Sequence, residues 1–260
     1  MNDHTREFYE LEAQRYPRIH ARPVQRYSAS FERELMEQYV GPLSVCLDIG
    51  CGEGRTARAL VDAGPGRTVI GLDFSLEMLR VAQTMPHAHP VHYCVGDAMN
   101  LPFAASTLDA TVAVTSLNNV PDLRISLGEM ARVLKPGGTM VLLVINKFEI
   151  AALFRGLYFF PFYVLRWLRG GKIYRSLVFS REELLKAMPE GVVQVKVQGM
   201  RLLPDLVPEW PLNFYAPFAP TFTRLLRWLA PADRWLCRHP FFGCYARFHF
   251  VVARKLSVDS

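Results

Sequence analysis

The chain has 260 residues, half of them hydrophobic and 21% charged, a composition that supports one sizeable buried core. This length exceeds what one core needs, so we predict a single domain with insertions and not two independent domains. The charge is uneven, because residues 1–150 hold 14 Lys and Arg against 17 Asp and Glu, whereas residues 151–260 hold 16 against 7. All four Trp also lie after residue 150, which indicates that the two parts do different jobs.

The cysteines and the apolar runs argue against several classes of protein. Five cysteines without C-x-x-C spacing do not form a zinc site, and the chain starts without a signal pattern, so we expect no metal and a reducing, cytoplasmic location. The most apolar run, residues 150–168, contains Arg155, Pro161 and Arg166, and we therefore predict no transmembrane helix. The pI of 9.2 would suit nucleic acid, but no RNA-binding module or lysine-rich tail occurs, so we predict no nucleic-acid partner.

The first elements in chain order are helical. Residues 1–42 are predicted to form an N-terminal helical cap, with an amphipathic pattern from Phe8 to Tyr39 that Pro17 and Pro23 interrupt. From residue 43 to residue 147, short apolar runs alternate with helical patterns whose N-caps are Ser75 and Asp122. This alternation predicts an α/β fold with a mostly parallel sheet and helices on both faces.

The alternation stops after Lys147, and residues 148–260 are predicted to form lid insertions and the last strands of the same domain. We predict helices at residues 181–188, 221–229 and 232–237, and strands at residues 192–203 and 245–255.

The central motif is VCLDIGCGEGRTARAL, a buried strand that ends at Asp48, a loop with Gly50, Gly52 and Gly54, and a helix that begins near Arg55. Glycines allow a sharp turn and a close approach of backbone to a ligand, and the loop presents free N–H groups at the carboxyl edge of the sheet. A dinucleotide fingerprint would need glycine at position 55, and no G-K-[ST] follows, so neither an NAD site nor a phosphate-binding P-loop is predicted. The alternative is a purely structural turn.

Two acidic residues follow the next two strands. Asp73 ends the second strand, where a carboxylate can accept hydrogen bonds from ribose hydroxyls, and Asp97 ends the third, where it could bind the amine of an adenine. Either acid alone could be a helix cap or a turn residue. Matched chemistry at three consecutive strand ends favours a nucleoside site.

Taken in order, LDIGCGEG, GLDFSLEML, GDAMNLPFAASTLDA and EMARVLKPGG resemble the motifs of the class I S-adenosylmethionine (SAM)-dependent methyltransferases, in the broad group that includes the ubiquinone and menaquinone C-methyltransferases. The resemblance covers about residues 43–147. It implies a Rossmann-like, seven-stranded sheet whose last strand is antiparallel, SAM as cofactor and S-adenosyl-L-homocysteine as product.

Carried over by position, the resemblance implies contacts to each part of SAM. The methionine part is surrounded by Asp48, Gly50, Cys51, Gly52 and Gly54, the ribose is held by Asp73, the adenine is bound by Phe74, Met78, Asp97, Ala98 and Met99, and Thr115 lies beside the sulfonium. Tyr16 resembles the aromatic residue that closes over the cofactor. Asn118 follows the fourth strand, where substrate-facing residues occur in the family.

Methyl transfer from a sulfonium needs mainly alignment and exclusion of water, so a general base is optional. For a hydroxyl acceptor a base would help, and the candidates are His20 in the cap and His239 in the late insertion. The sequence leaves three functions open: a transferase that methylates a small hydrophobic or aromatic acceptor, a membrane-surface methyltransferase for lipid-linked acceptors, and a non-catalytic SAM-binding regulator. Peripheral membrane contact is an alternative to an ordinary lid core for the aromatic, Arg-rich segment 150–168.

Overall fold

The computed structural model describes residues 3–42, 44–64, 66–86, 88–152, 176–206 and 219–257. The apolar segment 150–168 therefore lies almost entirely outside the described residues, as do Trp167 and Trp210. No helix in the described ranges is both long enough and apolar enough to span a bilayer.

The elements alternate between helix and strand through the first part of the chain. In order they are α1 Asp3–Glu12, the 3-10 helix η1 Ala13–Arg15, α2 Tyr16–His20, α3 Pro23–Tyr39, β1 Val45–Ile49, α4 Arg55–Ala63, β2 Thr68–Asp73, α5 Leu76–Thr84, β3 His92–Val95, β4 Leu108–Val114, the 3-10 helix η2 Leu117–Asn119, α6 Leu123–Val133 and β5 Leu134–Ile145. After residue 175 they are α8 Arg181–Lys186, β6 Val192–Met200, α9 Leu203–Leu206, α11 Ala219–Arg238, α12 Pro240–Gly243 and β7 Phe248–Lys255.

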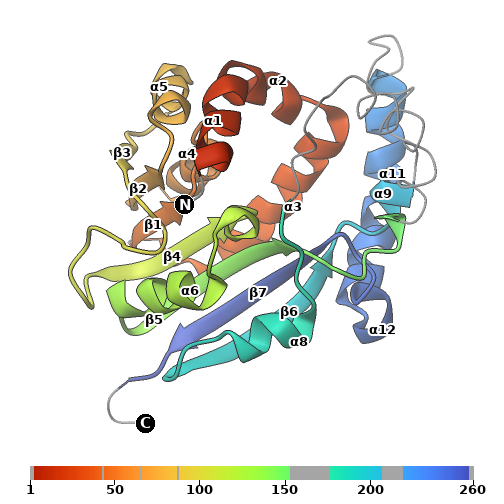
Figure 1. Cartoon of the computed structure of the whole chain (residues 1–260). Helices are drawn as coiled ribbons and strands as arrows, with labels where there is room; N and C mark the ends of the chain where they lie inside the picture. Colours follow the sequence, from red (N-terminus) through yellow and green to blue (C-terminus); the bar gives the residue numbers. More distant parts are fainter. Residues whose placement is uncertain are drawn as a thin grey trace.

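The strands of the described residues form one seven-stranded sheet with the order β3-β2-β1-β4-β5-β7-β6 (Figure 1). Strands β3, β2, β1, β4 and β5 are mutually parallel, and β7 runs antiparallel to both β5 and β6. The predicted α/β fold with a reversed last strand is confirmed. Strand order reverses between β1 and β4, and open α/β sheets bind ligands at the carboxyl ends of the strands at such a point.

The sheet separates two apolar layers. Alternating residues of β5 face opposite sides, with Met140 and Leu142 in one layer and Val141 and Leu143 in the other. The first layer packs against α6 and α8, and the second packs against α3 and α4. Helices therefore cover both faces of the sheet, as the alternating sequence predicts.

The cap and the last long helix show how prolines act by position. Pro23 is the first residue of α3, where its missing N–H has no helical partner anyway, so it starts a helix instead of interrupting one. The prediction of two short helices at residues 221–229 and 232–237 is wrong, because α11 runs through Pro231 as one helix of 20 residues. Pro231 is exposed, while Phe222, Leu226 and Cys237 of the opposite face are buried, and this burial holds the helix together.

Candidate functional site

The glycine loop lies between β1 and α4 and needs glycine for two separate reasons. Gly50, Gly52 and Gly54 have φ angles of +67°, +56° and +76°, in the left-handed region that favours glycine. A Cβ at Gly50 would lie 2.3 Å from the Cβ of Ser116, whereas a Cβ at Gly52 would meet no atom within 4 Å. Gly52 therefore has open space in front of it, and this space belongs to the cleft at the carboxyl edge of the sheet.

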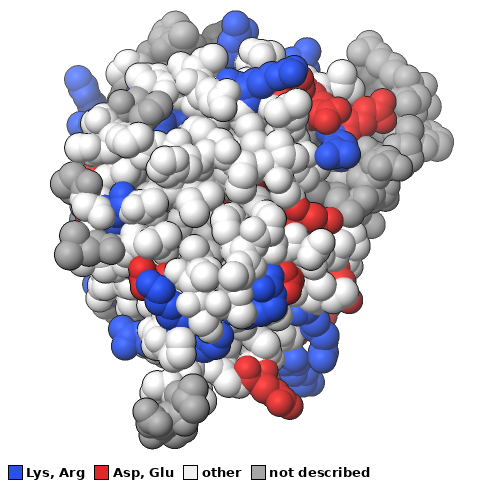
Figure 2. Space-filling view, turned by 90° about the vertical axis from the view of Figure 1, so that its left-hand side faces the viewer, with Lys and Arg blue, Asp and Glu red and all other residues white. Residues whose placement is uncertain are grey.

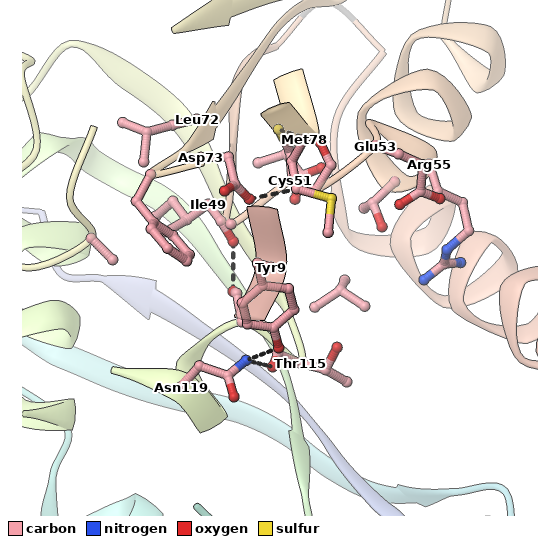
Figure 3. Close-up of a pocket in the computed structure, with 18 of the residues that line it drawn as sticks. Tyr9, Ile49, Cys51, Glu53, Arg55, Leu72, Asp73, Met78, Thr115 and Asn119 are labelled. Carbon is pink, nitrogen blue, oxygen red and sulfur yellow. Dashed lines mark hydrogen bonds between the residues drawn. The ribbon is translucent and has the colours of Figure 1, made fainter. Parts of the chain in front are cut away.

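Asp73 at the end of β2 is tied to this loop (Figure 3). Its Oδ2 accepts a hydrogen bond from the N–H of Gly52 at 2.8 Å, and its Oδ1 accepts one from the N–H of Ser75 at 2.9 Å. Burial raises the pKa of Asp73, and the N–H groups of Ser75, Gly52 and Phe74 oppose that rise. The carboxylate is thus fixed in orientation at the cleft while its remaining lone pairs can still accept ligand hydroxyls.

Asp48 at the end of β1 lies on the floor of the same cleft. The residue is almost fully buried, and its Oδ2 has no hydrogen-bond partner among the described residues. Burial raises the pKa of Asp48 to about 7, and the nearby Arg55 only partly offsets the effect. A buried carboxylate oxygen without a partner is costly, so it indicates a place for a cationic or hydrogen-bond-donating ligand group.

The N-terminal cap supplies aromatic rings to the cleft. Tyr9 lies between Tyr16 and Phe74, with ring centroids 5.7 Å and 6.0 Å away. The Nδ2 of Asn119 donates to the hydroxyl of Tyr9 at 2.9 Å, which links the cap to the turn after β4 (Figure 3). In that turn Thr115 has a φ of +57°, which is unusual for a β-branched residue and typical of functional sites.

A histidine and a buried glutamate form a pair at the cleft. The Nδ1 of His20 lies 2.6 Å from Oε1 of Glu53, and the side chains are 24% and 4% exposed. Burial alone would raise the pKa of Glu53, but the hydrogen bond and charge of His20 together with the charge of Arg55 outweigh it, so this pKa is lowered. Because Nδ1 of His20 is engaged with Glu53, Nε2 is the ring nitrogen that this pair leaves for a ligand.

Most of the residues predicted from the sequence line this one cleft: Tyr16, His20, Asp48, Gly50, Cys51, Gly52, Asp73, Phe74, Met78, Ala98 and Thr115. Five others, Asn118 among them, adjoin it or lie elsewhere. Gly54 is the N-cap of α4, and Asp97 and Met99 flank the lining residue Ala98, with Oδ1 of Asp97 accepting from the N–H of Met99 at 3.0 Å. His239 lines a separate cavity beside α12.

Asn118 and Asn119 differ in what they contact. The Nδ2 of Asn118 donates to the carbonyl of Leu177 at 2.6 Å, and its Oδ1 accepts from the N–H of Ile145 at 3.1 Å, so this buried side chain holds backbone together. Asn118 is not among the lining residues, whereas Asn119 is. Sequence reasoning missed Asn119 and Glu53, although the position of Glu53 between Gly52 and Gly54 placed it on the loop.

The sheet order and the crevice define an α/β domain of the nucleoside-binding type, and comparisons with known proteins specify the family. The family described as "Methyltransferase domain" matches residues 47–142. A demethylmenaquinone methyltransferase of Staphylococcus haemolyticus is 42% identical over 111 residues, which are 42% of this chain and 46% of that protein. The one of Lysinibacillus sphaericus is 34% identical over 163 residues, which are 62% of this chain and 69% of that protein.

Among solved structures, a SAM-dependent methyltransferase of Thermotoga maritima superposes with a TM-score of 0.63 at 20% identity, covering 97% of this chain and 99% of that one. The chain spans about half the length of the Staphylococcus relative that it matches. On the identity and coverage of the Lysinibacillus relative, together with the matched domain, the chain belongs to the class I SAM-dependent methyltransferase family.

Proposed function

We propose that this protein binds SAM and transfers its methyl group to a small hydrophobic or aromatic acceptor, on oxygen or carbon. The observation that carries the proposal is the single cleft that joins the glycine loop, the buried Asp48 and Asp73, and the aromatic cap. Its groups match the parts of SAM in kind: an acid for an ammonium, an acid for ribose hydroxyls, and apolar side chains for adenine.

The fit rests on the donors and acceptors present. The unpartnered Oδ2 of Asp48 suits the amino group of the methionine part, and the open space at Gly52 lets that part lie against backbone. Phe74 and Met78 offer apolar surfaces for an adenine ring. Gly96 and Ala98 line the cleft at its adenine end, with the Asp97 carboxylate between them in sequence.

When bound, SAM supplies a methyl group activated by a sulfonium, so the residues of this chain have to orient the acceptor and exclude water. Tyr9 and Tyr16 cover the cleft from the cap side, and the bond from Asn119 keeps Tyr9 in place. Thr115 lies in the turn that faces the cap. We assign the acceptor to the part of the cleft between this turn and the cap.

Of the two histidine candidates, we propose His20 as the general base for a hydroxyl acceptor. It lines the cleft and its Nδ1 binds Glu53, which leaves Nε2 able to take a proton from the acceptor. Glu53 would act through His20 as a positioning residue. His239 lies at the other cavity and has no role in this proposal.

Relatives that are named demethylmenaquinone methyltransferases support an acceptor that is apolar and carries a ring. A non-catalytic SAM-binding regulator is the second candidate. It would need the acids at the cleft but not the His20–Glu53 pair, and the presence of this pair favours catalysis.

Calorimetry with SAM tests the binding part of the proposal. We expect Asp73→Ala to weaken SAM binding by about 1–3 kcal/mol, the scale for losing a buried charged acceptor. The matched control is Asp62→Ala, which removes an exposed carboxylate of α4 and should leave the affinity unchanged. Equal affinities for the two variants would contradict the assigned ribose site.

Incubation with methyl-labelled SAM and extracts of the source organism tests the transfer part. Mass spectrometry should detect a product that gains one methyl group, and at limiting SAM this product should form more slowly with Asp73→Ala. Tight SAM binding without any methylated product would support the regulator instead.

A further inference from the structure

The helix pair α11–α12 carries large aromatic side chains on its outer surface. Both tryptophans that the structure describes are exposed, Trp228 at 77% and Trp235 at 63%, and Phe241 is 62% exposed. Trp228 and Trp235 are seven residues apart on α11, so they lie on the same face of the helix two turns apart. Exposed apolar side chains gathered in this way are typical of interaction sites.

The aromatic rings connect into one continuous surface. Trp235 contacts His239, which contacts Phe242, with ring centroids 5.9 Å and 5.2 Å apart. Phe241 contacts both Phe242 and Tyr245, at 5.3 Å and 5.6 Å. The chain of contacts therefore runs from the end of α11 across α12 to the turn before β7.

On α11 and α12 this surface carries exposed positive charge and no exposed acid. Arg224, Arg227 and Arg238 are exposed, and the single acid between residues 219 and 245 is Asp233, which is fully buried. Arg234 is paired with Glu34 of α3 at 2.6 Å. On the side of the molecule that holds α5 and β3, by contrast, Lys and Arg lie beside Asp and Glu (Figures 1 and 2).

We propose that the α11–α12 surface, formed by Arg224, Arg227, Trp228, Trp235, Arg238 and Phe241, docks on a bilayer that contains anionic lipids. Tryptophan and phenylalanine favour the headgroup boundary, and arginine is attracted to anionic headgroups. A surface with both properties, on which the adjoining Glu34 is already paired with Arg234, is complementary to such a bilayer.

The position of the surface relative to the cleft also suits a lipid-soluble acceptor. The carbonyl of Tyr245 accepts a hydrogen bond from the N–H of Ile150 at 3.2 Å, in the segment that follows the carboxyl end of β5. Phe148 in that segment is 61% exposed. Through this contact, the aromatic rings that continue the α11–α12 surface to Tyr245 reach the carboxyl edge of the sheet, on which the cleft opens. Docking itself does not require SAM, and the supply of an acceptor from the bilayer rests on the proposed function.

Co-sedimentation of the full chain with vesicles tests the proposal without cofactor or acceptor. The chain should sediment with vesicles that contain phosphatidylglycerol, bind pure phosphatidylcholine weakly, and be released as salt increases. Arg224→Glu/Arg227→Glu/Arg238→Glu should lower partitioning on the anionic vesicles by about a hundredfold. Trp228→Ser/Trp235→Ser/Phe241→Ser should lower it by about tenfold or more.

The matched control is Arg124→Glu/Ile125→Ser on α6, which removes an exposed cation and a 51% exposed apolar side chain from another part of the molecule and should bind like the unmodified chain. Thermal melts by circular dichroism verify that each variant is folded, and the salt dependence of the unmodified chain needs no variant. Failure of the unmodified chain to bind anionic vesicles, or full binding by both triple variants, would overturn the proposal. A dimer in lipid-free solution that the tryptophan variant dissociates would also overturn it, because the surface would then join two copies.

Discussion

The sheet core and the junction around α9 and α11 are held together by different interactions. Around β1, β4 and β5 the buried side chains are mostly apolar and alternate between two layers. At the junction, Arg201 is 1% exposed and binds Asp205 through two N–H···O bonds of 2.5 and 2.7 Å. Asp233, also buried, accepts from the hydroxyl of Tyr27 at 2.6 Å and from the N–H of Leu202 at 2.9 Å.

This difference explains which parts of the molecule a sequence reveals. An apolar strand is recognised from neighbouring residues, whereas the partners at the junction are far apart, with Tyr27 and Asp233 separated by 206 positions. Buried ion pairs also contribute less net stability than their number implies, because both charges lose hydration. The junction should therefore respond to mutation differently from the core and the cleft.

The largest expected effect is on catalysis at the cleft. If His20 is the base, His20→Gln should lower kcat for a hydroxyl acceptor by about 10²- to 10⁴-fold while SAM affinity stays the same. His92→Gln, an exposed histidine of β3, is the control. An unchanged kcat in His20→Gln would contradict the role of His20 as a base, and the cap would then only cover the cleft.

The next effect is on the stability of the junction. Asp205→Ala would remove the buried carboxylate that Arg201 and Arg247 share and should lower the free energy of unfolding by about 3–5 kcal/mol. The double variant Arg201→Met/Asp205→Leu should stay within about 2 kcal/mol of the unmodified chain. Glu182→Ala, which breaks an exposed pair with Lys186, should change it by less than about 1 kcal/mol. Urea unfolding measures all three, and equal losses for the single and double variants would contradict this account.

A pair of glycines separates the effect of steric crowding from that of an unfavourable φ. Gly50→Ala has two costs, a Cβ placed 2.3 Å from the Cβ of Ser116 and an unfavourable φ. Together they should lower the free energy of unfolding by about 2–4 kcal/mol. Gly191→Ala, at the start of β6, has a φ of +73° but open space around its Cβ, and should cost about 1 kcal/mol. Urea unfolding measures both variants. If they lose similar free energy of unfolding, Ser116 moves away from the added Cβ at little cost.

The smallest expected effect is the release of less than one proton from Asp48 when SAM binds. Because burial raises the pKa of Asp48 to about 7, the folded protein binds more protons than the unfolded chain between about pH 4 and pH 7, so this residue makes stability fall as pH rises through that window. A ligand ammonium beside Asp48 favours the charged carboxylate, so SAM binding near pH 7 should release protons. Calorimetry in two buffers of different ionisation enthalpy measures the release, and Asp48→Asn should abolish it.

The sequence predicted the strands from local signals, whereas most of the residues that line the cleft were expected from the family resemblance. Glycine spacing located the loop, and the acids at the ends of β1 and β2 followed from the strand pattern. The choice between Asn118 and Asn119 could not be predicted, since η2 turns one side chain into the core and its neighbour into the cleft. The pairing of His20 with Glu53 depends on how the cap folds back over the loop, which periodicity does not contain.

The backbone of Thr115 has a further consequence. The N–H of Thr115 donates a hydrogen bond of 2.7 Å to the carbonyl of Leu143, which holds the residue in its left-handed conformation. This conformation costs the folded chain about 1–3 kcal/mol relative to a relaxed turn. A glycine there would relieve the strain, yet it would remove a side chain from the wall of the cleft. Stability and the shape of the ligand cleft therefore make opposite demands on this position. Selection for heat resistance should favour glycine at position 115, and turnover should then fall.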